Sequence, residues 1–236
     1  MEDFYTDGTY FQNNPTWDAE DADWKFSKMN PMLKSYLAGK TGLKICEIGC
    51  GGGKLLSLIA KEYPQHNFTG WDLAPDAAKF WNYNTENLKF YAGDIFKQTS
   101  NEQYDLVLLI DVVEHVENPH QFLENVKTIT KNCLFHMPLD LSAISVIFDY
   151  KLIYVRKKVG HIHYFTKSIF LELLRESKMS ATQVMFSNSW KDSPQKSFST
   201  RLINIFRYAL NFFSPDMNAR VFGANTLFVL AKSNNE

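Results

Sequence analysis

The feature that most constrains this chain is a regular alternation of short apolar runs and helical patterns between residues 43 and 138. Buried strands are expected at LKICEI, NFTGWDL, LKFYAGD, YDLVLLID and NCLFHMP, and helices such as KLLSLIAKEY and NPHQFLENVKTIT are expected between them. Strands that alternate with helices in this way form βαβ units with right-handed crossovers, so neighbouring strands run parallel. The pattern therefore predicts an α/β fold with a mostly parallel sheet.

The segments on either side of this core are less regular. Residues 1–21 are polar and are expected to form an irregular arm, and Pro31 interrupts the helical pattern of residues 22–38. Residues 139–159 predict one or two apolar helices, and Thr166 is expected to cap the helix KSIFLELLRES. Two late strands, ATQVMFS and TLFVLAK, are predicted on either side of an amphipathic helix, RLINIFRYALNFF.

Composition excludes several classes of function. The formal net charge of -1 gives no electrostatic footprint for nucleic acid. No uncharged apolar run reaches the roughly 18 residues that cross a bilayer, and the acidic N-terminus MEDFYTDGTY differs from a secretory signal. The cysteines, Cys46, Cys50 and Cys133, form no even disulfide framework and suit a reducing cytoplasm. A single cytoplasmic domain across residues 1–236 is the simplest expectation.

A glycine-rich turn follows the first predicted strand. Residues 44–54 read KICEIGCGGGK, so a strand leads into a helix through closely spaced glycines. Glycine lets the backbone adopt positive φ and approach a ligand closely, and the helix N-terminus favours polar or anionic ligands. A dinucleotide-binding turn needs a sixth-position glycine where this chain has Lys54, and a P-loop needs Ser or Thr where it has Leu55. Glu47, at the end of the strand, would repel a phosphate and favour a cation.

Carboxylates lie at the ends of the first four predicted strands. Glu47 ends the first, Asp72 the second, Asp94 the third and Asp111 the fourth, beside the expected reacting centre. Open α/β sheets bind ligands at this carboxyl edge, and an acid after the second strand can accept hydrogen bonds from ribose hydroxyls. Asp94 could accept from an adenine amino group, and Ile95 could pack on the adenine face. A nucleoside that carries an ammonium and a sulfonium but no phosphate fits this row of acids, and S-adenosylmethionine is such a molecule.

Taken together, these stretches resemble the class I S-adenosylmethionine-dependent methyltransferases. The matching segments are EIGCGGG, GWDLAPDA, YAGDIF and YDLVLLIDVVEHVENP, and GHIHYFT is similar to the segment after the fifth strand in small-molecule methyltransferases of the ubiquinone-biosynthesis type. The resemblance implies a Rossmann-like, seven-stranded sheet with helices on both faces and an antiparallel last strand. It implies S-adenosylhomocysteine as the product and a cofactor-binding set that comprises Glu47, Gly49, Cys50, Gly51, Asp72, Leu73, Asp94, Ile95, Asp111 and Val112.

Three histidines are candidates for the general base that a hydroxyl acceptor would need. His115 follows the fourth strand, near the expected position of the methyl group. His161 and His163 alternate in GHIHYF, so they could face the same side of an extended segment and both reach the acceptor pocket. A structural role remains an alternative for each, and metal ligation for the last two, although no metal site is predicted. A base matters for an oxygen acceptor and is dispensable for a free amine.

Additions to the core are expected to build the acceptor site. Residues 1–40 are predicted to form an arm and a helix that act as a lid, while residues 139–165 and 190–215 supply helices around the acceptor. The helix RLINIFRYALNFF could cover the sheet, join a second copy or lie on a membrane surface. Methyltransferases that act on amide or base nitrogens often carry a motif of the Asn-Pro-Pro-Tyr type after the fourth strand. This chain has DVVE at that position, so such nitrogens are disfavoured as acceptors.

The expected function is methyl transfer from S-adenosylmethionine to a small-molecule or glycan acceptor, with oxygen favoured over nitrogen. A NAD-dependent protein of the same architecture and a non-catalytic nucleotide-binding protein are the alternatives. Glu47 and Lys54 argue against NAD, because they depart from the dinucleotide-binding pattern. The sequence leaves the identity of the acceptor and the oligomeric state open.

Overall fold

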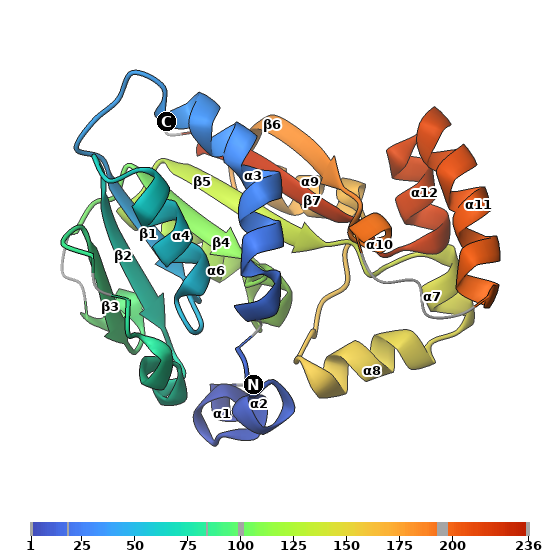
Figure 1. Ribbon diagram of the computed structural model, residues 1–236, viewed down its shortest axis with the longest axis horizontal. Helices are drawn as coiled ribbons and strands as arrows, with labels where there is room; N and C mark the ends of the chain where they lie inside the picture. The colour runs from blue at the N-terminus through green and yellow to red at the C-terminus, as the bar shows by residue number, and fades with distance from the viewer. Residues whose placement is uncertain (1, 18, 84, 99–101, 193–197, 235–236) are drawn as a thin grey trace.

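A seven-stranded sheet crosses the computed structural model, which describes residues 2–17, 19–83, 85–98, 102–192 and 198–234 (Figure 1). The strands are β1 (Lys44–Ile48), β2 (Asn67–Asp72), β3 (Leu88–Ala92), β4 (Leu106–Ile110), β5 (Asn132–Pro138), β6 (Met179–Ser187) and β7 (Thr226–Ser233). Their order is β3-β2-β1-β4-β5-β7-β6. The pairs within β1 to β5 are parallel, whereas β7 runs antiparallel to both β5 and β6. The predicted Rossmann-like sheet with an antiparallel last strand is confirmed.

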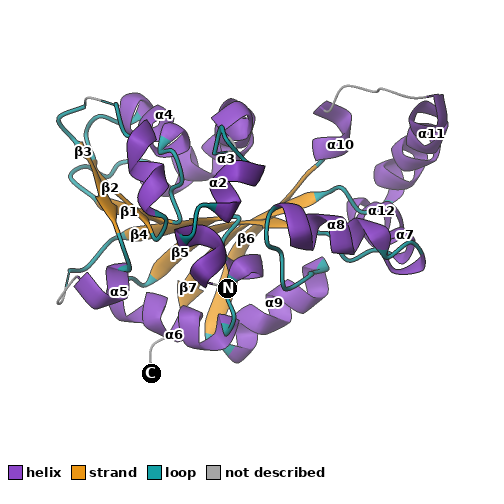
Figure 2. Cartoon of the chain, turned by 90° about the horizontal axis from the view of Figure 1, so that it is seen from below, coloured by secondary structure: helices purple, strands orange, loops and turns teal. Residues whose placement is uncertain are grey.

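Helices lie on both faces of the sheet, with α3 and α4 on one face and α5, α6 and α9 on the other (Figure 2). The α-helices are α1 (Glu2–Thr6), α2 (Thr9–Asn13), α3 (Ala22–Leu37), α4 (Lys54–Glu62), α5 (Ile95–Gln98), α6 (Pro119–Ile129), α7 (Ala143–Ile147), α8 (Tyr150–Lys158), α9 (Lys167–Glu176), α10 (Ser189–Asp192), α11 (Phe198–Phe213) and α12 (Pro215–Phe222). Short 3-10 helices are η1 (Ala19–Asp21), η2 (Pro75–Phe80) and η3 (Val113–His115).

Strand β4 contributes to both of the large clusters of the hydrophobic core. All five of its side chains are buried, and they alternate between the two faces of the sheet. Leu106 and Leu108 join the cluster beneath α3 and α4, while Val107 and Leu109 join the cluster beneath α6 and α9. A run of apolar residues without alternation is what a strand covered on both faces requires, as the sequence predicted.

The structure differs from the sequence prediction in the first 40 residues and after β2. The arm, expected to be irregular, contains the short helices α1 and α2. Helix α3 continues through Pro31, because Met29, Leu33 and Leu37 are buried on its inner face. Burying such side chains stabilises by about 1.5–3 kcal/mol each, which outweighs the roughly 3 kcal/mol cost of one interior proline. The predicted helix PDAAKFWNY is the 3-10 helix η2.

The helical additions lie to one side of the sheet rather than over it (Figure 1). Helix α11 packs against α12, and α12 packs against α7. Phe212 and Phe213, at the end of α11, are 85% and 82% exposed. Residues 193–197, inside the second predicted addition, lie outside the described residues. None of the helices in the described ranges combines the length and the apolar character needed to cross a bilayer.

Candidate active site

A cavity of about 960 Å³ opens at the carboxyl edge of the sheet. Its lining includes the glycine turn (residues 49–53), the loops after β2, β3 and β4, the arm with the start of α3, the first turns of α6, the ends of β5 and β7, and the segment after α8. These groups are far apart in the sequence, and the parallel strands bring them together because all their carboxyl ends lie at one edge. All ten predicted cofactor-binding residues line this cavity.

The glycine turn needs glycine for both conformation and space. Gly49 and Gly53 have φ of 73° and 76°, in the left-handed region. A Cβ on Gly49 would lie 2.8 Å from Val112 Cγ2, and a Cβ on Gly53 would lie 2.6 Å from Phe90 Cζ. The backbone can therefore pass close to its neighbours only without side chains at these positions.

Lys54, the residue that breaks the dinucleotide-binding pattern, anchors the turn to η1 and the first turn of α3. Its Nζ is 2.6 Å from Asp23 Oδ2 and donates to the carbonyl of Ala19 at 3.1 Å. A glycine at this position could form neither contact. The start of α4 is thus tied to the N-terminal part of the chain that closes one side of the cavity.

Glu47 lies beside the glycine turn with an unsatisfied carboxyl group. Only 3% of its surface is exposed, and its Oε2 has no hydrogen-bond partner among the described residues. Burial raises the pKa of Glu47 to about 8; Lys25 opposes this rise, while Asp72 and Asp111 add to it. A cationic ligand would supply the missing partner and favour the ionised carboxylate.

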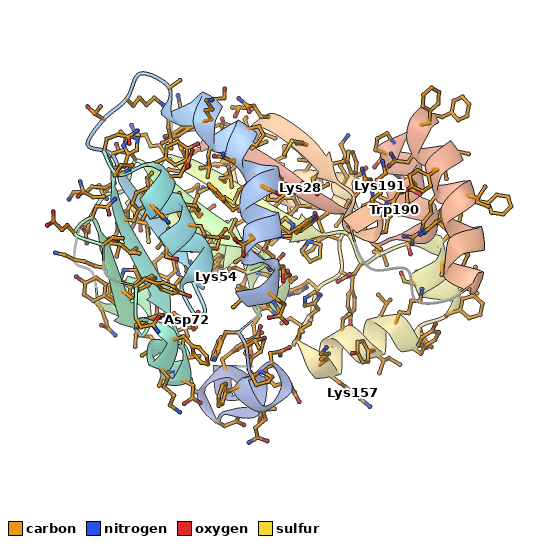
Figure 3. All side chains as sticks on the ribbon, viewed as in Figure 1. Lys28, Lys54, Asp72, Lys157, Trp190 and Lys191 are labelled. Carbon is orange, nitrogen blue, oxygen red and sulfur yellow. The ribbon has the colours of Figure 1, made fainter. Side chains whose placement is uncertain are left out.

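Asp72, at the carboxyl end of β2 (Figure 3), holds two turns in place. Its Oδ2 accepts from Gly51 N at 2.7 Å, and its Oδ1 accepts from Ala74 N at 2.9 Å. Burial raises the pKa of Asp72 to about 6, although these two hydrogen bonds oppose the rise. Each oxygen keeps a lone pair that can accept from a ligand hydroxyl. Leu73, next to it, is 44% exposed and lines the cavity.

The loop after β3 presents a carboxylate beside an apolar side chain. Asp94 Oδ1 accepts from Phe96 N at 2.9 Å, and Asp94 Oδ2 lies 3.5 Å from Lys97 Nζ. Ile95 is buried in the core and also contributes to the wall of the cavity. The geometry suits a flat ring with a polar edge, as the sequence analysis expected for adenine.

Asp111 lines the cavity, but both of its carboxylate oxygens are already bound by the protein. Oδ1 lies 2.7 Å from His136 Nδ1, and Oδ2 lies 2.8 Å from Lys25 Nζ. Burial alone would raise the pKa of Asp111, but His136 and Lys25 hold it well below its usual range. Asp111 thus fixes an ammonium group from α3 and an imidazole from β5 at the cavity. No motif marked Lys25 or His136 in the sequence.

A second group of titratable residues, the histidine cluster (Glu114, His115, Asp140 and His161), lies beyond Asp111. Asp140 Oδ2 lies 2.6 Å from His161 Nδ1, and His161 Nε2 lies 3.9 Å from Glu114 Oε1. The rings of His115 and His161 meet edge to face with their centroids 4.8 Å apart. His115 and His161 line the cavity, as predicted.

Burial controls the charges in this cluster. Glu114 is 1% exposed, and neither of its oxygens has a hydrogen-bond partner among the described residues. Burial, and then the charge of Asp111, raise the pKa of Glu114 well above its usual range. Burial and His161 together lower the pKa of His115 to about 4. Burial thus favours the protonated form of the Glu114 carboxyl and keeps His115 neutral near pH 7.

His163 does not join this cluster. Its Nε2 donates to the carbonyl of Val116 at 2.9 Å, and its ring lines a separate surface pocket next to His120. The expectation that His161 and His163 face one pocket is wrong. Their segment is not extended, because the amides of Ile162 and His163 both donate to the carbonyl of Glu114.

The histidine cluster also offers a donor set for a cation. One ligand atom from each of Glu114, His115 and His161 lies within 4.8 Å of the others. The Nδ1 atoms of the two imidazoles are engaged by Tyr5 and Asp140, which leaves their Nε2 atoms for a ligand. This arrangement suits an ion of the zinc type if the donors move closer together.

Asp140 is the residue that sequence reasoning should have found. It follows β5 by two positions, at the same sheet edge as the four predicted acids. Extending the rule of acids at strand ends to the fifth strand would have identified it. Tyr5 carried no such signal, since its contact with His115 joins residues 110 positions apart.

Comparisons with known proteins agree with this architecture. Residues 46–132 match the family model described as a methyltransferase domain. The ubiquinone biosynthesis O-methyltransferase of Glaesserella parasuis serovar 5 (strain SH0165) is 31% identical over 131 residues, which cover 49% of this chain and 55% of that protein. The (S)-tetrahydroprotoberberine N-methyltransferase of Eschscholzia californica is 28% identical over 94 residues, or 38% and 27% of the two chains. The chain thus spans about half the length, or less, of these curated relatives.

A solved structure extends the likeness to the whole fold. The plantazolicin methyltransferase BpumL, in complex with a monoazolic desmethylPZN analog and S-adenosylhomocysteine, aligns over 99% of this chain and 93% of its own, with a TM-score of 0.63 and 21% identity. The family match covers β1 to the start of β5, where the glycine turn and the four acids lie. Residues 46–132 are therefore similar to a methyltransferase domain, and the chain as a whole has the fold of a solved S-adenosylhomocysteine-bound methyltransferase.

Proposed function

We propose that this chain transfers the methyl group of S-adenosylmethionine to a hydroxyl group of a small-molecule or glycan acceptor. The observation that carries the proposal is Glu47, a buried carboxyl group whose Oε2 lacks a partner beside the glycine turn. A buried polar group without a partner costs about 1–3 kcal/mol. An ammonium group of the cofactor would provide the missing hydrogen bond and offset the charge.

The other cofactor contacts follow from the same edge of the sheet. Asp72 would accept from the ribose hydroxyls, while Asp94 and Ile95 would bind the polar edge and the face of adenine. Lys25, held by Asp111 at 2.8 Å, would lie near the cofactor's carboxylate. These contacts would use no phosphate-binding device, in keeping with Glu47 and Lys54.

His161 is the residue we assign as general base. When Asp140 accepts from Nδ1–H, the lone pair of His161 is on Nε2, where an acceptor hydroxyl can donate to it. The Glu114 carboxyl, whose Oε1 lies 3.9 Å from Nε2, could hydrogen-bond to the same acceptor. The sulfonium supplies the leaving group, so the protein contributes orientation and a base worth about 10²- to 10⁴-fold in rate.

Nitrogen is the second candidate acceptor atom. A relative that matches 38% of the chain is named as an N-methyltransferase, and a free amine would need no base. A cation bound by Glu114, His115 and His161 is an alternative way to activate a hydroxyl. We favour the Asp140–His161 pair, because its 2.6 Å contact is already formed. We also assign the protein to the cytoplasm, in accord with its three free cysteines.

The test begins with calorimetry of the purified protein against S-adenosylhomocysteine, S-adenosylmethionine and NAD. We expect both S-adenosyl compounds to bind and NAD not to bind. Binding of NAD without binding of either S-adenosyl compound would refute the proposal. Incubation of a metabolite or glycan pool with methyl-labelled cofactor should then yield a methyl ether. No labelled product from any pool would favour the non-catalytic alternative, and labelled amines would move the acceptor atom to nitrogen. Loss of activity after EDTA dialysis, restored by a divalent ion, would favour the cation.

A further inference from the structure

The N-terminal arm closes one side of the cavity. Tyr5 and Tyr10 of the arm and Trp17, which follows the arm, line the cavity together with the glycine turn. Trp17 is buried, and its ring lies 5.0 Å from that of Tyr10. A cofactor held by the glycine turn would therefore be enclosed by this arm, which must move for the cofactor to enter or leave.

Tyr5 connects the arm to the opposite side of the cavity. Its hydroxyl lies 2.7 Å from His115 Nδ1 and 3.3 Å from the carbonyl oxygen of Val159, after α8. Asn14 adds a second connection, since its Nδ2 donates to the carbonyl of Lys158 at 3.2 Å. Both contacts join residues more than 100 positions apart, so neither is a product of local folding.

The segment after α8 has a glycine, Gly160, at the point that the arm approaches most closely. Gly160 has a φ of 86°, and a Cβ on it would lie 2.8 Å from Tyr5 Oη and 3.0 Å from Phe4 Cε1. A side chain at this position would push the arm away. The close approach of Tyr5 is therefore built into both segments, independently of the hydrogen bond.

We propose that Tyr5 is the latch of a lid formed by α1 and α2, and that latching positions His115 against His161. The proposal rests on the function proposed above. The Tyr5 hydroxyl donates its one hydrogen to the carbonyl of Val159, so it accepts from Nδ1–H of His115 and leaves the lone pair of that imidazole on Nε2. That tautomer, and the edge-to-face contact with His161, are fixed when the arm is closed. Tyr5 thus acts through His115 as a positioning residue.

The Tyr5→Phe variant removes the hydroxyl and keeps the ring. Tyr150→Phe is the matched control, because Tyr150 is 62% exposed on α8. Stopped-flow release of S-adenosylhomocysteine should be roughly two- to tenfold faster in Tyr5→Phe than in the wild type, as expected for one lost hydrogen bond. Tyr150→Phe should release at the wild-type rate. Equal release rates in Tyr5→Phe and the wild type would overturn the latch.

Hydrogen exchange of the ligand-free protein gives a readout that does not depend on the proposed function. The amides of Gln12 and Asn14, bonded within the arm, should exchange faster in Tyr5→Phe, while the sheet amides should not change. If the wild type binds no cofactor product, the proposed function fails while this measurement still tests the lid. Unchanged exchange in the arm would refute the latch even if the enzyme is active.

A double variant tests whether Tyr5 acts through His115. If it does, Tyr5→Phe combined with His115→Asn should release product no faster than His115→Asn alone. Additive effects would show that Tyr5 holds the arm through other contacts and would overturn the positioning role. In Tyr5→Phe, kcat should fall by a larger factor than the KM for the acceptor rises, because the residues that contact the acceptor remain.

Discussion

The two halves of the cavity are stabilised in different ways. Around the glycine turn, backbone amides bind the polar side chains, as when Asp72 accepts from Gly51 and Ala74. In the histidine cluster, the partners come from distant segments, and the Glu114 carboxyl has none among the described residues. The Asp72 hydrogen bonds form when the neighbouring strands β1 and β2 pair, whereas the cluster needs the arm, the loop after β4 and the segment after α8 to meet.

This difference indicates that the two halves of the cavity have different roles. A turn held by its own backbone is preorganised for a ligand that is the same in every cycle. A cluster assembled from separate segments can close after the ligands bind and can accommodate a particular acceptor. We therefore expect changes in the glycine turn to affect stability and cofactor affinity, and changes in the histidine cluster to affect turnover.

Gly49→Ala is expected to have the largest effect. The added Cβ would lie 2.8 Å from Val112 Cγ2, at a φ of 73°. Left-handed backbone costs a non-glycine residue about 1–2 kcal/mol, and overpacking adds about 1–3 kcal/mol. Gly39→Ala is the control, because its φ is 71° and no atom lies within 4 Å of the added Cβ. Left-handed strain should lower the Tm of both variants, but Gly49→Ala should lose more, and calorimetry should show at least tenfold weaker cofactor binding for Gly49→Ala alone. Equal losses in both variants would mean that space at the turn is unimportant.

This contrast also explains which parts of the molecule the sequence could predict. The strands, the glycine turn and the acids after β1 to β4 are marked by local patterns, because apolar runs and turn residues specify nearby backbone. All ten residues assigned to the cofactor from these patterns line one cavity.

Side-chain contacts between distant segments had no such local signal. The pairs Tyr5 with His115 and Lys25 with Asp111 depend on how the arm and α3 pack over the sheet. The direction of His163 was predicted wrongly, because it follows from amide hydrogen bonds to a carbonyl in another loop. Alternation in the sequence predicts a common face only if the segment is extended.

His161→Asn and Asp140→Asn should each lower kcat while leaving cofactor affinity unchanged. Loss of the base costs about 10²- to 10⁴-fold, and Asp140→Asn should cost less, because it disturbs only the orientation of the imidazole. His163→Asn is the control within the same segment, since its ring lies in a separate pocket. Steady-state kinetics with a hydroxyl acceptor would measure the three effects. A loss in His163→Asn as large as that in His161→Asn would contradict the assignment of the base.

Cofactor binding should release a proton from Glu47. Its pKa is raised to about 8 in the free protein, so the carboxyl is mostly protonated at pH 7. The folded state then binds this proton more tightly than the unfolded state. The contribution of Glu47 to the free energy of unfolding therefore falls as pH rises from the ordinary pKa of a glutamate towards 8. A cation favours the ionised form, so binding at pH 7 should expel about one proton. Calorimetry in buffers of different ionisation enthalpy measures this number, and Glu47→Gln should abolish the release. A buffer-independent enthalpy for the wild type would contradict the prediction.

The smallest effect is expected outside both halves of the cavity, on α11. Phe212 and Phe213 are more than four-fifths exposed, so replacing both with Ser removes little buried surface. Surface changes of this kind usually alter stability by about 0.5 kcal/mol or less. Tm, cofactor affinity and kcat with a water-soluble acceptor should therefore match the wild type. A fall in Tm that depends on protein concentration would instead indicate that these rings are buried between copies of the chain, because only an associated state gains stability by mass action.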